Sequence, residues 1–322
     1  MKRHEEIKKG IRLALRPFNL DIVDRQAMDR HERLLGLLAD CDTIRRFPHG
    51  YFQRGGDGDG TLWTTHCAGL FSCLTTVMWT VMEITRAGER CYDVNNALGM
   101  QWFKESPWND TWHDLFLRRE RAEIDSLMNG QPRRPEHFNH HGDYQEIVRE
   151  HLGTGWAENF LRAYLTPAPE VRKTADMFMA KYRISSTPTI AVYYRGTDKY
   201  KEVKPAPVTV YFEIVDSLLA SQPGAEILIQ TDQAQVREQF ARKYGQACKY
   251  IAELPVTRGS RAIHDVRRLC GNRDLFARNL YAMCLAIAGC HTLVTHTGNV
   301  SFFLALHALL AGKQVIQVHG ES

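Results

Sequence analysis

The segment STPTIAVYYRGTDKYKE, residues 186–202, holds the side chains best suited to chemistry in this chain. An apolar, β-prone run ends at Arg195, and Gly196 follows it directly. Arginine presents a planar fork of N–H donors that matches phosphate oxygens, and glycine lets a backbone come close to a ligand. An Asp-Lys pair and then Glu202 follow. This order predicts a grip on a diphosphate and transfer chemistry on a nucleotide-activated donor, with Glu202 as the carboxylate that reaches the reacting hydroxyl.

Each of these groups also has a simpler interpretation. Arg195 could pair with a carboxylate of the protein, and Asp198-Lys199 could be a solvated turn. Glu202 lies among lysines and could be one more surface charge. The neighbouring strand ends, described next, favour the functional interpretation.

A regular pattern from about residue 171 must position these groups. Apolar runs typical of strands occur at 189–194, 226–230, 248–253, 292–295 and 314–318, and helical patterns lie between them. Strands that alternate with helices through short polar turns predict a parallel sheet. Ligands of such α/β folds bind beyond the carboxyl ends of the strands.

Polar residues follow three of these strands, and they form the candidate site. They are Arg195 and Asp198 after the first strand, Thr231 and Asp232 after the second, and Thr295, Thr297, Gly298 and Asn299 at the end of the fourth. An alternative remains for the last two groups, because threonine, aspartate and glycine are also typical of helix caps and turns.

The first half of the chain is less regular and is rich in tryptophan, histidine and charge. Leu70, Leu74, Val77 and Val81 recur at helical spacing and predict a helix after Gly69. Trp102, Trp108 and Trp112 could line a sugar-binding cleft, although core packing is the commoner role. His137, His140 and His141 match no zinc spacing, so no metal site is predicted.

Composition limits the class of protein. With 322 residues, 44% hydrophobic content and a formal charge of +4, the chain suits one large or two ordinary globular domains and not a nucleic-acid binder. The apolar run 68–84 is too short and threonine-rich to span a membrane, and no signal peptide is visible, so a cytoplasmic protein is expected. The secretory lumen is the alternative if this sequence lacks a leader. Eight cysteines without a CxxC pair favour reduced thiols.

Taken in order, the strand ends resemble the fucosyltransferase superfamily, most closely the α1,6-fucosyltransferases of the nodulation and core-fucosylation type. That family has a strand ending in His-x-Arg-Arg-x-Asp-Lys, matched here by YYRGTDK at 193–199. Its Ala-Thr-Asp-Asp strand end is matched by QTDQ at 230–233, its Leu-His by Ile263-His264, and its Ser/Thr-rich turn by LVTHTGN at 293–299. The match runs over roughly 130 residues.

The resemblance implies a GT-B glycosyltransferase: α/β, with two Rossmann-like domains and a parallel sheet in the C-terminal half. Residues 1–168 would be the acceptor-side domain, and residues 169–322 the sugar-nucleotide-binding domain. The partners would be GDP-fucose and a glycan acceptor. Transfer would invert the anomeric centre and need no metal and no cofactor.

The resemblance also assigns roles to residues. Glu202 would be the base, with Arg195 and Asp198 as the other catalytic groups. Donor contacts would come from Tyr193, Arg195, Gly196, Lys199, Thr231, Asp232, His264, Thr295, Thr297, Gly298 and Asn299. The last three would meet the phosphates at a helix N-terminus, where N–H groups favour anions.

This chain departs from the family pattern at several positions. Tyr193 replaces the family histidine, Gly196 replaces the second arginine, and the base-reading aspartate falls near Met283. Another sugar nucleotide is therefore an alternative donor. A catalytically silent nucleotide- or sugar-binding protein on the same scaffold is the alternative from another class, and a base at Glu202 discriminates between the two.

Overall fold

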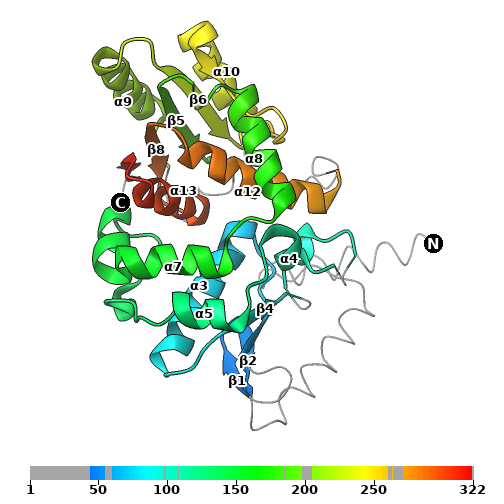
Figure 1. The fold of residues 1–322 in the computed structure, drawn as a ribbon. Coiled ribbons are helices and arrows are strands. Elements are labelled where there is room, and N and C mark those ends of the chain that lie inside the picture. The colour runs from blue at the N-terminus through cyan, green and yellow to red at the C-terminus, as the bar shows by residue number, and fades with distance from the viewer. Residues whose placement is uncertain are drawn as a thin grey trace, which may run out of the picture.

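A computed structural model describes residues 44–54, 60–96, 99–106, 109–184, 186–197, 205–259, 263 and 271–320. The C-terminal half is built on a five-stranded sheet, and the N-terminal half on a long helix and a smaller sheet (Figure 1). Asp198, Lys199, Glu202 and His264 lie outside the described residues, as does Trp108.

The five-stranded sheet has the order β7-β6-β5-β8-β9, and every neighbouring pair is parallel. The strands are β5 (Thr189–Tyr194), β6 (Glu226–Thr231), β7 (Cys248–Lys249), β8 (Thr292–His296) and β9 (Gln314–Val318). All six residues of the central strand β5 are buried, which explains its unbroken apolar sequence. The predicted α/β class, with a parallel sheet in the C-terminal half, is confirmed.

Helices cover both faces of this sheet. Helices α9 (Val208–Ser221) and α10 (Ala234–Tyr244) pack on one face, and a separate hydrophobic cluster fills that side. The other face carries α12 (Arg273–Ala288) and α13 (Asn299–Leu310), and α8 (Pro169–Lys181) packs on α12. The short 3-10 turn η7 (Gly245–Ala247) connects α10 to β7.

One predicted strand is much shorter than expected. The apolar pattern at 248–253 predicts six residues, but β7 contains only Cys248 and Lys249. β7 lies at the edge of the sheet, where one neighbour alone supplies ladder partners. Ile251 is still buried, but there the chain turns, and Leu254 N–H donates to the Ile251 carbonyl at 3.4 Å.

The described part of the N-terminal half contains a second sheet, with the order β1-β2-β3-β4. Its strands are β1 (Ile44–Phe47), β2 (Gly50–Gln53), β3 (Thr61–Thr64) and β4 (Asp93–Asn95). The first two pairs are antiparallel and only β3–β4 is parallel. A two-residue link joins β1 to β2, and so short a link permits only antiparallel pairing. This sheet therefore differs from the Rossmann-like one that GT-B implies for this half.

The helix predicted after Gly69 is confirmed as α3 (Leu70–Arg86). Its threonines are compatible with burial because their hydroxyls donate to carbonyls four residues earlier, as in Thr75 to Phe71 at 2.9 Å and Thr85 to Val81 at 2.8 Å. No helix in the described part of the chain is long and apolar enough to cross a membrane. The half also contains η3 (Gln101–Phe103), α4 (Thr111–Leu115), α5 (Arg121–Leu127), η4 (Pro135–His137), α6 (Tyr144–Glu146), the π-helix η5 (Ile147–Leu152) and α7 (Thr154–Tyr164).

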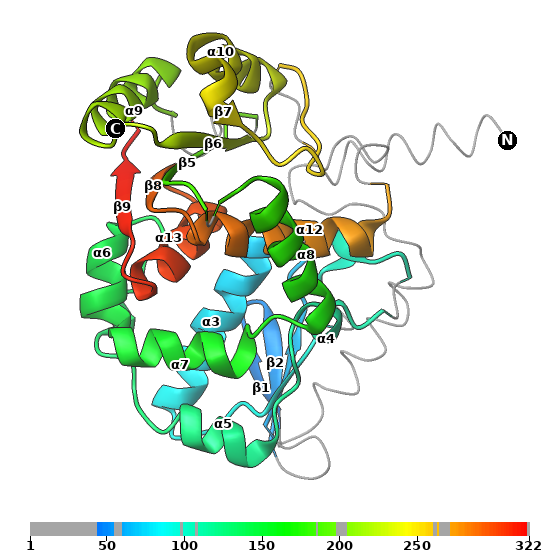
Figure 2. The same cartoon turned by 45° about the horizontal axis from the view of Figure 1, so that its top comes forward.

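One hydrophobic core joins the two halves. α12 and α13 lie between the parallel sheet and the N-terminal helices α3 and α7 (Figure 2). Phe71 of α3 contacts Phe303 of α13 with ring centroids 5.9 Å apart, and Phe116 meets Tyr281 of α12 edge-on at 4.8 Å. The division at 168/169 stays a prediction, and this core extends across it.

Two expectations about side chains can be compared with the packing. Trp112 is a core residue, 3% exposed, with its ring 4.8 Å from that of Phe116. The six cysteines within the described ranges are thiols and not disulfides. Cys41 and Cys270 lie outside those ranges.

Candidate functional site

Three of the predicted strand ends are neighbours in the structure. β5 lies between β6 and β8, and Tyr194 pairs in register with Thr231. Because the strands are parallel, their carboxyl ends share one edge of the sheet. Arg195, Asp232 and the turn after β8 are therefore brought to the same edge, as the sequence predicts.

The Asp232 carboxylate organises the end of β5. Its Oδ1 accepts from the Gly196 N–H at 3.1 Å, and its Oδ2 accepts from the Thr197 hydroxyl at 2.5 Å. Oδ2 also lies 3.8 Å from Arg195 Nε, and the side chains of Asp232 and Arg195 are 12% and 31% exposed. Arg195 thus has the carboxylate neighbour of its simpler interpretation, and it still faces solvent.

Gly196 is required by a close approach of the protein to itself. A Cβ at this position would lie 2.4 Å from Gln233 Oε1. Gln233 is held in place, since its Nε2 donates to the Gly259 carbonyl at 3.0 Å and its N–H donates to Thr231 Oγ1 at 3.1 Å. The N-cap of α10 is Gln233, so Thr231 and Asp232 do not cap that helix.

The turn between β8 and α13 is held by a residue that the sequence analysis did not identify. The Tyr144 hydroxyl accepts from the Gly298 N–H at 2.8 Å and lies 3.0 Å and 3.1 Å from the carbonyls of His296 and Gly298. Burial raises the pKa of Tyr144, so the hydroxyl keeps its proton and donates to these carbonyls. Tyr144 lies in a loop-like stretch of sequence, and no local pattern reveals a partner about 150 residues away.

Two further side chains brace the same turn. Thr75 Oγ1 of α3 lies 2.9 Å from Asn299 Oδ1, and Gln317 of β9 donates to Thr297 Oγ1 at 3.1 Å. Ser301 Oγ lies 3.0 Å from His296 Nδ1. The start of α13 is therefore positioned by α3 from the N-terminal half as well as by the sheet.

A hollow of about 280 Å³ opens where these groups meet. It is lined by Tyr193, Arg195, His296, Gly298, Asn299, Val300 and Ser301. The rings of Tyr193 and His296 are stacked, with centroids 5.6 Å apart. A guanidinium opposite the first turn of a helix combines a positive charge with N–H groups that have no intrahelical acceptor, which is an arrangement suited to an anion.

Other predicted residues lie near this hollow without lining it. Thr231 and Asp232 take part in the turn after β6, and Thr295 is fully buried within β8. The roles of Asp198, Lys199, Glu202 and His264 stay predictions, because these residues lie outside the described ranges.

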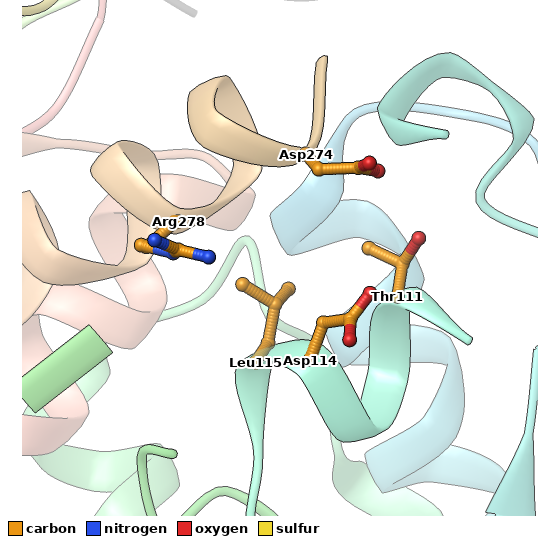
Figure 3. Close-up of a pocket in the computed structure, with 5 residues that line it drawn as sticks. All are labelled: Thr111, Asp114, Leu115, Asp274 and Arg278. Carbon is orange, nitrogen blue, oxygen red and sulfur yellow. The ribbon is translucent and has the colours of Figure 1, made fainter. Parts of the chain in front are cut away.

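A larger hollow, of about 530 Å³, lies between α4 and α12 (Figure 3). Its lining residues are Thr111, Asp114, Leu115, Asp274 and Arg278. Burial, together with the nearby charges of Asp274 and Asp110, raises the pKa of Asp114. The sequence analysis did not identify this hollow, because its two sides lie about 160 positions apart in the chain.

The histidines that could suggest a zinc site contact other aromatic rings. His140 and His141 contact each other, and His137 contacts His151. Among the described residues, no group of three or more histidine, cysteine, aspartate or glutamate side chains is placed to hold a metal ion.

Comparison with known proteins finds fucosyltransferases. No family model and no curated protein matches the sequence. Among solved structures, NodZ α-1,6-fucosyltransferase co-crystallized with GDP matches with a TM-score of 0.46 and 16% identity, over 76% of this chain and 90% of that one. Fucosyltransferase NodZ from Bradyrhizobium matches with a TM-score of 0.48 and 15% identity, over 78% of this chain and 92% of that one. POFUT1 in complex with GDP matches with a TM-score of 0.35 and 10% identity, over 51% of this chain and 50% of that one.

Proposed function

We propose that this protein is an inverting glycosyltransferase that moves fucose from GDP-fucose to a glycan acceptor without a metal ion. One observation carries the proposal: Arg195 and the first turn of α13 line the same hollow, at the carboxyl ends of β5 and β8. The order of the motifs that supply these groups supports the choice of donor. Arg195 and the helix N-terminus would hold the diphosphate.

The proposed reaction is a single displacement. The acceptor oxygen attacks the anomeric carbon from the face opposite the diphosphate, and Glu202 takes the hydroxyl proton. The bond between the anomeric carbon and the phosphate oxygen breaks, and its electron pair leaves with GDP. Arg195 and the N–H groups at the start of α13 stabilise the charge that develops on the diphosphate.

Asp232 has a supporting part in this proposal. It lies 3.8 Å from Arg195 Nε and accepts the next backbone N–H, so it restricts where the guanidinium can lie. Asp198, Lys199, Thr231, His264 and Thr295 are proposed for the donor site from the motif resemblance alone.

Ligand-induced stabilisation tests the proposal. A ligand that binds only the folded state raises its apparent stability. We expect GDP to raise the melting temperature well above the effects of GMP, UDP, TDP and CMP, because both the diphosphate and the base contribute. Equal rises in melting temperature with GDP and GMP would argue against the diphosphate site. A larger rise with UDP or TDP than with GDP would indicate a sugar donor that carries that other nucleotide.

An activity assay then separates an enzyme from a silent binder. Release of GDP from GDP-fucose should be measurable with a glycan acceptor and should persist in excess EDTA. Binding of GDP with no turnover on any acceptor of an α1,6-fucosyltransferase would favour the silent binder. Activity lost in EDTA and restored by manganese would contradict the metal-independent mechanism.

A further inference from the structure

Tyr144 joins the N-terminal half to the proposed diphosphate site. It is the first residue of α6, and it is 1% exposed. Its ring lies 5.9 Å from that of Phe302, in the first turns of α13. Its hydroxyl forms hydrogen bonds with backbone groups of His296 and Gly298, at the turn between β8 and α13, and Ser301 also lies within hydrogen-bonding reach of it.

The Tyr144 hydroxyl forms hydrogen bonds with residues on both sides of that turn. A tyrosine hydroxyl has one hydrogen to donate and can also accept. Here it accepts from Gly298 N–H at 2.8 Å, and two carbonyls lie within reach of its own hydrogen, those of His296 at 3.0 Å and Gly298 at 3.1 Å. One hydroxyl thus connects the last residue of β8 with the N-cap of α13.

Tyr144 is itself held from β9. Its N–H donates to Gln317 Oε1 at 2.9 Å, while Gln317 Nε2 donates to Thr297 Oγ1 at 3.1 Å and to the Gly142 carbonyl at 3.0 Å. Tyr144 and Gln317 therefore form hydrogen bonds with both residues of the turn: Tyr144 with Gly298, and Gln317 with Thr297.

We propose that Tyr144 is a positioning residue for diphosphate binding. It occupies the Gly298 N–H and fixes the turn, so that the N–H groups of the residues after Gly298 face the hollow beside Arg195. The inference rests on the proposed function, because it concerns the same anion site. It assigns part of the donor affinity to the N-terminal half, which supplies none of the predicted donor contacts.

Loss of the hydroxyl has a defined consequence. In Tyr144→Phe the ring still fills its place against Phe302, but the Gly298 N–H and the His296 carbonyl lose a buried partner. A buried polar group without a partner is costly, so the turn rearranges to regain one. The residues that face the anion then move relative to Arg195.

The test compares Tyr144→Phe with Tyr164→Phe. Tyr164 is also buried in the N-terminal half, 4% exposed, and donates to the Cys91 carbonyl at 2.6 Å, far along the chain from the turn. Dissociation constants for GDP and for inorganic pyrophosphate are measured by calorimetry, with the melting temperature of each variant. We expect Tyr144→Phe to raise both constants by the same factor, about tenfold, and Tyr164→Phe to leave them unchanged.

The outcomes are distinct. Wild-type protein that binds neither GDP nor pyrophosphate would overturn the proposed function together with this inference. Wild-type binding that is unchanged or tighter in Tyr144→Phe, or weaker for GDP but not for pyrophosphate, would overturn this inference alone. Should Tyr144→Phe not fold, the partly exposed Gln317 offers a second variant: Gln317→Leu must weaken both ligands, and equal affinities would reject the positioning role.

Discussion

At the scale of single residues, the candidate site combines a partly exposed cation with a carboxylate that restrains it. Asp232 Oδ2 lies 3.8 Å from Arg195 Nε, close enough to restrict where the guanidinium can lie. The same carboxylate fixes the backbone at Gly196 and the hydroxyl of Thr197. The sequence predicts Arg195 and Asp232 as site residues, but the contact between them is a property of the folded sheet.

Replacement of Arg195 should weaken diphosphate binding. We expect Arg195→Ala to cost about 1.5–3 kcal/mol of GDP binding, the range for hydrogen bonds to charged groups, and to remove most of the preference for GDP over GMP. Arg86→Ala is the control, because Arg86 lies at the end of α3 in an exposed pair with Glu83 and should leave GDP binding unchanged. Calorimetric titration checks both, and equal GDP affinity in wild type and Arg195→Ala would remove Arg195 from the site.

Glu202 is tested by turnover rather than by binding. General-base catalysis contributes about 10²–10⁴-fold, so Glu202→Gln should lower kcat by that factor and leave the Kd of GDP nearly unchanged. Initial rates of GDP release measure kcat, and GDP titrations on the same samples measure Kd. Wild-type turnover in Glu202→Gln would move the base elsewhere, with Asp198 as the next candidate.

Gly196 is expected to tolerate no side chain, for a reason independent of ligand. The new Cβ of Gly196→Ala would meet Gln233 Oε1 at 2.4 Å, so the restrained Gln233 or the strand end must shift. We expect a loss of about 1–3 kcal/mol in unfolding free energy, typical of overpacking, and weaker GDP binding. Gly155→Ala in α7 is the control: its Cβ meets nothing within 4 Å, and helix propensity predicts no loss of stability. Urea denaturation measures both variants.

At the scale of elements, the length and strength of the apolar pattern determined which helices and strands could be predicted from the sequence. β5 and β8 are strongly apolar and lie near their expected bounds of 189–194 and 292–295, and the long helix α3 begins after Gly69 as expected. The strands β1 to β4 have three or four residues each, too few for an alternation to be recognised, and they were not predicted. The brace from Tyr144 was missed for another reason: it depends on two segments meeting in space, and neither carries a local signal.

The contact between β4 and α4 predicts a pH dependence of stability. His113 of α4 lies between two carboxylates, with Nε2 3.0 Å from Asp93 Oδ1 and Nδ1 2.5 Å from Asp110 Oδ2. Burial disfavours the charged ring, but the bonds to Asp110 and Asp93 outweigh it and raise the pKa of His113 to about 9. A histidine whose folded pKa is raised stabilises fully below its unfolded pKa, about 6.5, and that contribution is lost as the pH rises through the folded pKa.

We therefore expect the unfolding free energy of the wild type to fall by about 1–3 kcal/mol more between pH 6.5 and 9 than that of His113→Gln. His137→Gln, at an exposed histidine, should keep the wild-type slope. Burial lowers the pKa of His66 and of His307 to about 4, so the effect of these two histidines on stability changes with pH only below pH 6.5, outside this window. Denaturation in urea at several pH values checks the slopes, and parallel curves for wild type and His113→Gln would reject the ion-pair account.

At the scale of the whole molecule, the proposed donor site depends on both halves. Seven of the twelve residues of α13 are buried, including Phe302, Phe303 and Leu306, because the sheet covers one side and α3 and α7 cover others. A helix that is apolar on most of its surface needs such cover. The turn that begins α13 is braced from the N-terminal half by Thr75 and Tyr144.

This shared core predicts that the two halves unfold together. Separating them would expose the faces of α12 and α13 that meet α3, α4 and α7, and hydrophobic exposure of that kind costs about 25 cal/mol for each Å². We expect a single calorimetric transition for residues 44–320, with the van't Hoff enthalpy close to the calorimetric enthalpy. GDP should shift that whole transition, since the N-terminal half cannot melt while the site stays intact. Two separated transitions, with GDP moving only one of them, would show that residues 169–322 form the donor site unaided.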